Sequence, residues 1–370
     1  MNKHQKKFIN LLKAGLWNTA PDASVVTQDT DWDEILRLAV NQTVLGFITN
    51  GVLQMPKEER PPKNIYFNLI KKVSDIEQRN DKMNIAVPQL MKKLQEQGCP
   101  TILMKGQGAA MNYLTPQYRQ AGDIDLFVGF DEDVYNRTNE AMATIATHIG
   151  HNNQRRRHAD YVMGDIVVEI HGNVSCCISK QCDAEIGAWA RERLQDKNEV
   201  FRSRLGDIVV PPRNFDAIYI FVHMLNHFMG GGVGLRQVSD WMMYLNKHHD
   251  KINADMLTSD IKRLGIEKAW RLFASVAVVH FDFPRERMPL YDETFDKKSE
   301  LVLDHIFKTG NFGALQKEAQ LSNDANRVLK KIVTFFGQIP VYFDLIKLFP
   351  KETFYCFGRF IKTGAASLQD

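Results

Sequence analysis

The sequence predicts an α+β fold, in which a small mixed β-sheet carries helices on one face and is embedded in a largely α-helical chain. Between residues 101 and 171, short apolar runs of strand length alternate with helical patterns in the order β-α-β-α-β-β. The last two runs are joined by Gly164-Asp165, a two-residue link typical of a tight hairpin. Elsewhere, apolar residues recur mostly with helical spacing, so the sheet is expected to form a single core within the chain.

The composition is that of a globular protein of two or three domains. The chain has 370 residues, of which 44% are hydrophobic and 25% charged, and its formal net charge is +3. This near-neutral balance argues against a general nucleic-acid binder, and the basic run at 155–158 is either a solvated loop or a local phosphate or RNA contact. Five cysteines without framework spacing indicate free thiols in a reducing cytosol. With no signal-peptide core and no apolar run of about 18 residues, we expect a cytoplasmic protein without a membrane span.

Three regions are expected along the chain. Residues 1–98 form a helical region packed on the core, with a helix that Thr30 or Asp31 caps, a proline-rich break and a long helix or helix pair that ends before Gly98. Residues 99–175 form the core that contains the sheet. Residues 176–370 form a mainly helical region that offers a binding pocket or a partner surface.

The core is expected to hold four strands and two helices. Asp131 caps the second helix, which is expected to run to about residue 150. The strands are expected at 101–104, 123–128, 158–163 and 166–171, and the first helix at 107–114. After the core, helices are expected at 183–197 and 214–229, with a short strand at 207–210 between them.

Three acidic residues lie on the predicted strands. Asp123 and Asp125 alternate with apolar residues, so both point to one face of their strand. Glu169 occupies the middle of the last predicted strand, where an unpartnered charge is costly. Oxygen ligands favour Mg²⁺ or Mn²⁺, so the three carboxylates are candidates for a metal site. The alternative is that the two aspartates are exposed acids on an edge strand and the glutamate is unrelated.

A candidate phosphate seat precedes the aspartates. Lys105-Gly106 lies between the first strand and the first helix, where free backbone amides and the helix dipole favour an anion. Lys105 adds a full positive charge, and Arg119 adds another just before the aspartates.

These residues resemble the nucleotidyltransferase superfamily related to DNA polymerase beta. The pattern of that superfamily is an apolar residue, then Gly, then Gly or Ser, followed by Asp-x-Asp and a carboxylate on a later strand. This chain has Met104-Lys105-Gly106, with Lys where many relatives have Gly and no Ser after the glycine. In this respect it is most similar to a bacterial branch usually called the uncharacterised nucleotidyltransferase family. The resemblance is strongest across the predicted core.

The resemblance implies that the sheet is a nucleotidyltransferase core. Such a core would move a nucleoside monophosphate from a nucleoside triphosphate to a hydroxyl acceptor and release pyrophosphate. The three carboxylates would be catalytic and would hold Mg²⁺ (or Mn²⁺), while Lys105, Gly106 and Arg119 would hold the nucleotide phosphates.

Five further residues are candidates for a substrate pocket. His171 shares a strand face with Glu169 and either contacts substrate, orients a carboxylate or is structural. His223 and His227 have the i, i+4 spacing of a metal pair but lack the glutamate of the zinc-protease motif, so they line a pocket, pack in a core or bind zinc. Arg236 and Asp240 follow a glycine loop, and similar arrangements in the suspected family line the nucleotide cleft.

The sequence is compatible with more than one kind of acceptor and with two alternative functions. The near-neutral charge favours a small molecule or a protein over a long RNA as the acceptor, with residues 176–370 forming the acceptor pocket or a partner surface. One alternative is a catalytically silent nucleotide-binding or scaffold protein that retains the fold. Another is a metal-dependent phosphohydrolase built on His223 and His227.

Overall fold

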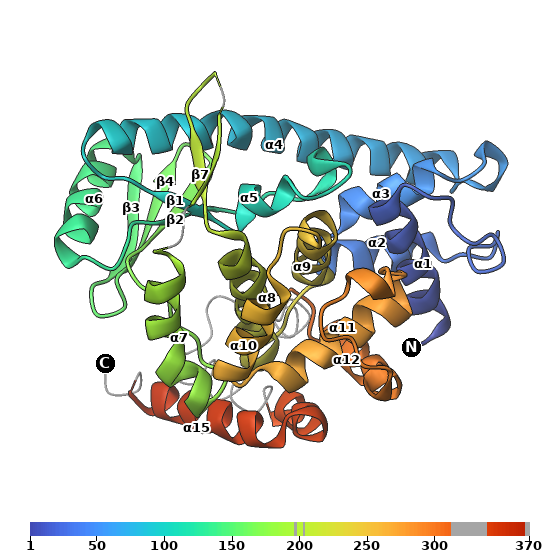
Figure 1. Ribbon diagram of the computed structural model, residues 1–370. Coiled ribbons are helices and arrows are strands. Elements are labelled where there is room, and N and C mark those ends of the chain that lie inside the picture. The colour runs from blue at the N-terminus through green and yellow to red at the C-terminus, as the bar shows by residue number, and fades with distance from the viewer. Residues whose placement is uncertain (196–197, 203, 312–338, 367–370) are drawn as a thin grey trace.

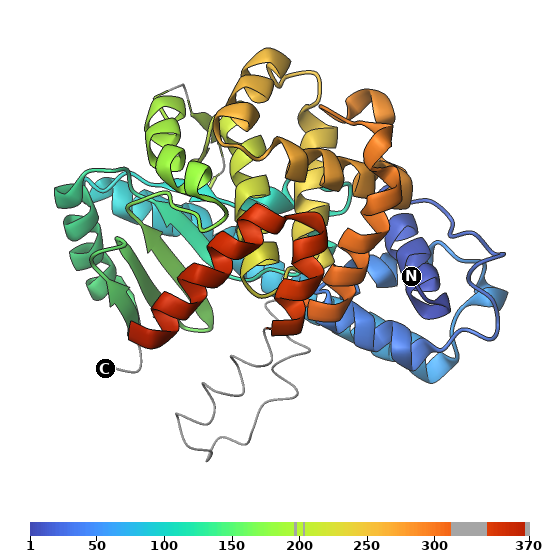
Figure 2. The ribbon, with the colours of Figure 1, turned by 90° about the horizontal axis from the view of Figure 1, so that it is seen from below.

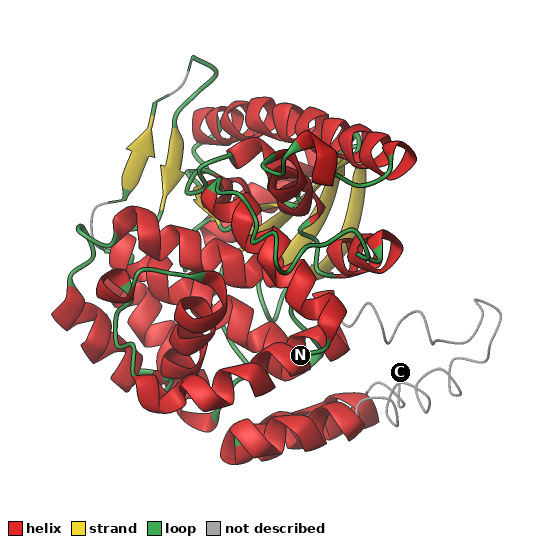
Figure 3. Ribbon diagram, turned by 90° about the vertical axis from the view of Figure 1, so that its right-hand side faces the viewer, coloured by secondary structure: helices red, strands yellow, loops and turns green. Residues whose placement is uncertain are grey.

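The computed structural model describes residues 1–195, 198–202, 204–311 and 339–366 (Figure 1). A sheet lies at one side of the molecule, with helices around it, and a separate two-stranded sheet projects beside it (Figures 1 and 3). This arrangement confirms the α+β prediction. The strands are β1 (Ile102–Met104), β2 (Ile124–Phe127), β3 (His148–Asn153), β4 (His158–Met163), β5 (Ile166–His171), β6 (Glu199–Phe201) and β7 (Ile208–Val210).

The larger sheet is mixed and has the strand order β1-β2-β5-β4-β3. Only β2 and β5 run parallel; the other neighbours are antiparallel. Gly164 has a φ of 63° and begins the two-residue turn between β4 and β5, where Met163 pairs with Ile166 as the predicted hairpin requires. The parallel pair is the feature that places the later glutamate beside the two aspartates.

Helices cover one face of the sheet. The α-helices that lie wholly within the described residues include α1 (Lys3–Trp17), α2 (Trp32–Asn41), α3 (Leu45–Leu53), α4 (Lys63–Glu96), α5 (Gly106–Ala110), α6 (Glu132–Ile145), α7 (Lys180–Arg193), α8 (Arg213–Gly230), α9 (Leu235–His248), α10 (Ala254–Arg263), α11 (Glu267–Phe281), α12 (Asp296–Thr309) and α15 (Pro350–Ala366). Apolar side chains of α4 and α6 pack against Ile124, Leu126, Val168 and Ile170. Since side chains alternate along a strand, the residues between these point to the opposite face, toward α8.

The helical remainder forms a second apolar core. It is built largely from α1 to α3, α7 to α12 and α15, and its largest buried side chains include Trp189, Trp241 and Trp270. In the view from below, α15 lies across these helices (Figure 2). Its Arg359 pairs with Asp183 of α7. None of the described helices is both long enough and apolar enough to span a membrane.

Several element boundaries differ from the sequence predictions. The helix that Asp131 caps ends at Ile145, and β3 follows it as an unpredicted edge strand. Most side chains of β3 are exposed, so the strand carries no apolar alternation, and its pairing with β4 holds it in the sheet. The helix predicted to begin after Thr30 or Asp31 ends at Asn41, and α3 follows from Leu45, since Thr43 between them adopts a φ of 53°.

Candidate active site

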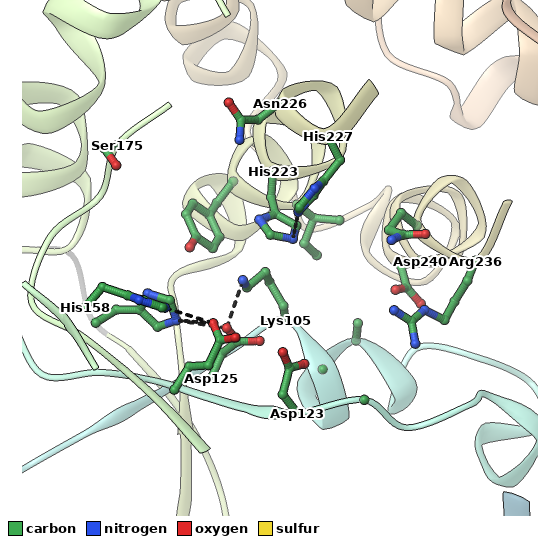
Figure 4. Close-up of a pocket in the computed structure, with 18 of the residues that line it drawn as sticks. Lys105, Asp123, Asp125, His158, Ser175, His223, Asn226, His227, Arg236 and Asp240 are labelled. Atoms are coloured by element: carbon green, nitrogen blue, oxygen red, sulfur yellow. Dashed lines mark hydrogen bonds and ion pairs between the residues drawn. The ribbon is translucent and has the colours of Figure 1, made fainter. Parts of the chain in front are cut away.

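A cavity of about 470 Å³ lies between the open face of the sheet and helices α8 and α9 (Figure 4). Strand residues form one wall and helix residues form the opposite wall. All eleven predicted site residues line this cavity: Lys105, Gly106, Arg119, Asp123, Asp125, Glu169, His171, His223, His227, Arg236 and Asp240. Its lining also contains residues that the sequence analysis did not assign to the site, among them His158, Asn173, Ser175, Tyr219 and Asn226.

The two parallel strands bring the three carboxylates together. In the register of β2 and β5, Asp125 lies directly opposite Glu169, and Asp123 immediately precedes β2. Carboxylate oxygens of the three residues all lie within 4.8 Å of one another. Burial, and then the charges of Asp125 and Glu169, raise the pKa of Asp123 to about 6. The site therefore concentrates negative charge where water does not screen it.

Lys105 partly compensates this charge. Its Nζ lies 2.9 Å from Oδ1 of Asp125, and both side chains are largely buried. Burial opposes ionisation of Asp125, but Lys105 and His171 hold the pKa of that carboxyl below its usual value. Lys105 itself has a φ of 51°, a backbone conformation that costs a non-glycine residue about 1–3 kcal/mol.

Gly106 allows the turn after Lys105 to approach the acidic site closely. Its φ is 43°, and a Cβ at this position would lie 3.0 Å from the backbone oxygen of Asp123. The predicted helix after this turn is short, since α5 ends at Ala110. The turn therefore contacts the carboxylate strand directly.

Two histidines contact the carboxylates from the same wall. His171 Nε2 lies 2.9 Å from Asp125 Oδ1 and 3.3 Å from Glu169 Oε2. His158 Nε2 lies 3.2 Å from the same oxygen of Glu169. Burial would raise the pKa of Glu169, but hydrogen bonds from both histidines hold it below its usual value.

The sequence contained a signal for His158 that the sequence analysis did not use. A two-residue turn at 164–165 pairs Met163 with Ile166, and counting back along the hairpin pairs His158 with His171. From the sequence, His158 was expected to end a basic run and to begin a strand, with no role in the site. The rest of that run lies outside the cavity, apart from Arg156, which contributes to its lining.

Helix α8 forms the opposite wall with neutral groups. The Nε2 atoms of His223 and His227 lie 3.2 Å apart, so one imidazole donates a hydrogen bond to the other. Burial, and then the charge of Lys105, lower the pKa of both, that of His227 to about 4. Among the described residues, the pair belongs to no group of three or more metal-binding side chains. The geometry thus gives no support to a zinc site or a phosphohydrolase centre on α8.

Two arginines, Arg119 and Arg236, lie at helix α9 in different surroundings. Arg119 Nε and Nη2 bind the two oxygens of Asp240 at 2.7 and 2.8 Å, and Tyr113 donates to the same carboxylate at 2.6 Å. The phosphate role of Arg119 stays a prediction, because its guanidinium is bound to Asp240 here. Arg236 differs: Nη1 donates to the backbone oxygen of Gln120 at 3.1 Å, but its buried Nε has no hydrogen-bond partner.

The acidic group fits a divalent cation. Three buried or half-buried carboxylates face one lysine, and the raised pKa of Asp123 shows that its negative charge is not fully compensated. A divalent ion with oxygen ligands would supply the missing positive charge. Asp123, Asp125 and Glu169 are the residues that would hold it.

Comparison with known proteins gives one match. No curated protein and no solved structure matches the chain. Residues 28–282, about two thirds of the sequence, match the family model described as uncharacterised nucleotidyltransferase, and they include every residue of the candidate site. The chain therefore belongs to the uncharacterised nucleotidyltransferase family.

Proposed function

We propose that the protein is a metal-dependent nucleotidyltransferase that moves a nucleoside monophosphate from a nucleoside triphosphate to a hydroxyl acceptor and releases pyrophosphate. One observation carries the proposal: Asp125 and Glu169 on two parallel strands and Asp123 just before the first of them converge in a cavity that Lys105 and Arg236 also line. Family membership supports the reaction type. A scaffold has no need of three acids around one position, because their mutual repulsion destabilises it.

The carboxylates would hold Mg²⁺ or Mn²⁺. When bound, such ions neutralise phosphate charge and lower the pKa of a coordinated hydroxyl. Asp125 and Glu169 lie directly opposite on adjacent strands, so their relative positions are fixed by the backbone hydrogen bonds of the sheet. Lys105 holds Asp125 ionised before any ion arrives, and its ammonium can turn from this carboxylate to the phosphates of a bound nucleotide.

Arg236 is proposed to bind the phosphates of the nucleotide. It is a buried cation with one unpartnered N–H, and it lines the cavity on the side where Asp123 lies (Figure 4). A guanidinium binds phosphate oxygens through two parallel hydrogen bonds. A triphosphate is therefore a better partner for Arg236 than a carboxylate that is already paired. Arg119 then acts as a positioning residue, since its pair with Asp240 fixes α9 against the loop before β2.

The wall formed by α8 is proposed to contact the uncharged part of a substrate. His223 and His227 are neutral around pH 7, and Tyr219 and Asn226 add hydroxyl and amide groups. Neutral hydrogen-bonding groups recognise bases, sugars and hydroxyls without repelling a cation on the opposite wall. A cavity of about 470 Å³ favours a small molecule or a protein side chain over a long RNA as the acceptor.

The test is a pyrophosphate-release assay with each labelled nucleoside triphosphate in Mg²⁺ or Mn²⁺, with mass spectrometry of the protein in the same samples. The wild type is compared with Asp123→Asn/Asp125→Asn and with Lys82→Ala, a control in an exposed ion pair outside the cavity. We expect release, or attachment of a nucleotide to the protein, in the wild type and the control and not in the double variant.

Two outcomes would count against the proposal. Nucleotide binding that requires the metal but yields no pyrophosphate, even when candidate small-molecule and protein acceptors are supplied, would indicate a silent nucleotide sensor. An absence of nucleotide binding in a folded wild type would indicate a scaffold.

A further inference from the structure

A second group of metal-binding side chains overlaps the acidic one. His158, Glu169 and His171 lie on the β4-β5 hairpin, where His158 pairs directly with His171. Their ligand atoms all lie within 4.8 Å of one another. The group differs from the carboxylate site in its chemistry, since two of its three ligands are imidazole nitrogens.

The distances within this group suit a single bound ion. His158 Nε2 and His171 Nε2 lie 3.2 and 3.3 Å from Oε2 of Glu169. An ion with bonds of about 2.0–2.2 Å places neighbouring ligand atoms roughly 3.0–3.5 Å apart in tetrahedral or octahedral geometry. The same spacing also allows hydrogen bonds, so the spacing alone does not distinguish an ion site from a hydrogen-bonded group.

An unsatisfied carboxylate oxygen lies beside the two imidazoles. Asp160 pairs with Glu169 across the hairpin and shares a strand face with His158. Its buried Oδ1 has no hydrogen-bond partner and lies 3.5 Å from His158 Nε2. A buried carboxylate oxygen without a donor is costly, and a cation between Asp160, His158 and Glu169 would satisfy it.

We propose that His158, Glu169 and His171 form a site for a divalent transition-metal ion of the Zn²⁺ and Co²⁺ type, with Asp160 as a further ligand. Two imidazoles and a carboxylate are typical of transition-metal centres, whereas Mg²⁺ prefers oxygen ligands alone. The hairpin holds the ligands on a rigid scaffold. The inference does not depend on nucleotidyl transfer, because the ion would bind without nucleotide.

Glu169 connects the two groups. It belongs to the nitrogen-containing site and to the carboxylate site formed with Asp123 and Asp125. Glu169 would therefore be shared by two ions of different kinds, a transition-metal ion held with His158 and His171 and a hard cation held with Asp123 and Asp125. The pair of metal sites would then be unequal in ion preference.

The experiment is a Co²⁺ titration of the full-length protein after removal of bound metal, followed by visible absorption, with competition by Zn²⁺ and by excess Mg²⁺. We expect one Co²⁺ per chain with the spectrum of nitrogen and oxygen ligands, displaced by Zn²⁺ and not by Mg²⁺. His158→Gln should weaken Co²⁺ binding by about 100-fold or more, beyond the 10–100-fold cost of changing an outer partner.

Two matched variants separate this site from its surroundings. His151→Gln alters an exposed histidine on the neighbouring strand β3 and should leave Co²⁺ affinity unchanged. Asp123→Asn alters only the carboxylate site and should retain Co²⁺ binding, even if it has lost every transferase activity. Circular dichroism and the melting temperature verify that each variant is folded.

Three results would overturn the proposal. They are no stoichiometric Co²⁺ binding to the wild type, equal affinity in folded His158→Gln, and an intense sulfur-to-cobalt band. The last would assign the ion to the buried pair of free cysteines Cys176 and Cys182 instead.

Discussion

The two walls of the cavity contain similar residue types, but one wall is charged and the other is neutral. The strand wall carries charged groups in direct contact, with Lys105 and His171 both bound to Asp125. The helix wall carries imidazoles whose pKa values are lowered by burial, so His223 and His227 stay neutral. A histidine next to carboxylates thus belongs to the ionic part of the site, while a histidine on an apolar helix acts as a neutral hydrogen-bonding group.

The two walls therefore suit different tasks. Ionised carboxylates on rigid strands suit ion binding, because the sheet fixes their separation. Neutral, desolvated groups suit an uncharged base, sugar or acceptor. Arg236 lies where the two walls meet, and its unpartnered Nε gives the cavity a cation that is not yet neutralised by a bound carboxylate. Each of the following variants tests one side of this comparison.

The largest effect is expected on the strand wall. Asp125→Asn should reduce pyrophosphate release by at least about 10³-fold, since removal of a metal ligand costs several kcal/mol of transition-state stabilisation. His227→Gln on the helix wall should alter the KM for the acceptor more than kcat. Steady-state kinetics of both folded variants measure the contrast, and equal losses of kcat would show that the walls do not differ in this way.

The next largest effect is a loss of stability when the Arg119–Asp240 pair at the edge of the helix wall is broken. Asp240→Ala leaves the buried guanidinium of Arg119 without its partner and should lower the free energy of unfolding by about 3–5 kcal/mol. Urea unfolding measures the loss. Glu96→Ala, in an exposed pair with Lys92, is the control and should cost less than about 1 kcal/mol. Similar losses in the two variants would contradict a structural role for the Arg119–Asp240 pair.

The parts of the fold that depend on local patterns were predictable from the sequence. The parts that depend on long-range pairing were not. The Gly164-Asp165 turn predicted the β4-β5 hairpin, and the apolar runs predicted β1 and β2. Strand β3 was missed, because its mostly exposed side chains carry no alternation and only pairing with β4 defines it. The periodicity of one segment does not predict which distant strand that segment pairs with.

The candidate site shows the same limit. Alternation predicted that Asp123 and Asp125 share a face, but only the parallel register of β2 with β5 shows Asp125 opposite Glu169. The partner of Arg119 lies more than a hundred residues away on α9, so no local pattern revealed that its charge is already bound. The position of His158 beside His171 follows from the register of the predicted hairpin, because the turn at 164–165 fixes the pairing of its strands.

A smaller effect is expected at the junction of the walls. Arg236→Met should weaken nucleoside triphosphate binding by about 10–100-fold, since a hydrogen bond to a charged group contributes about 1.5–3 kcal/mol. The matching nucleoside should bind equally well to both proteins, because it has no phosphate. Calorimetric titration with both ligands measures the effect. Equal weakening of nucleoside and triphosphate would place Arg236 at the base or sugar instead.

The smallest effect is the pH dependence of cation binding to the strand wall. Burial and two neighbouring carboxylates raise the pKa of Asp123 from 3.8 to about 6. The folded protein therefore takes up this proton more readily than the unfolded chain, so ionisation of Asp123 lowers the stability of the metal-free protein as pH rises from about 4 to 6. A bound cation reverses the balance, because it interacts with the ionised carboxylate. Below pH 6 protons compete with Mg²⁺, and affinity should fall by up to about tenfold per pH unit.

Mg²⁺ titrations between about pH 7.5 and pH 5 measure this dependence, and Asp123→Asn is the control because it lacks the titrating group. His171 must be considered as well: burial lowers its pKa, but its contacts with Asp125 and Glu169 raise it overall. Protonated His171 would also oppose a cation, so any dependence that persists in Asp123→Asn comes from other groups of the strand wall, His171 among them. An Mg²⁺ affinity that stays constant through pH 6 in the wild type would mean that Asp123 is ionised throughout, and its charge would then have to be compensated by Lys105 and Arg236 alone.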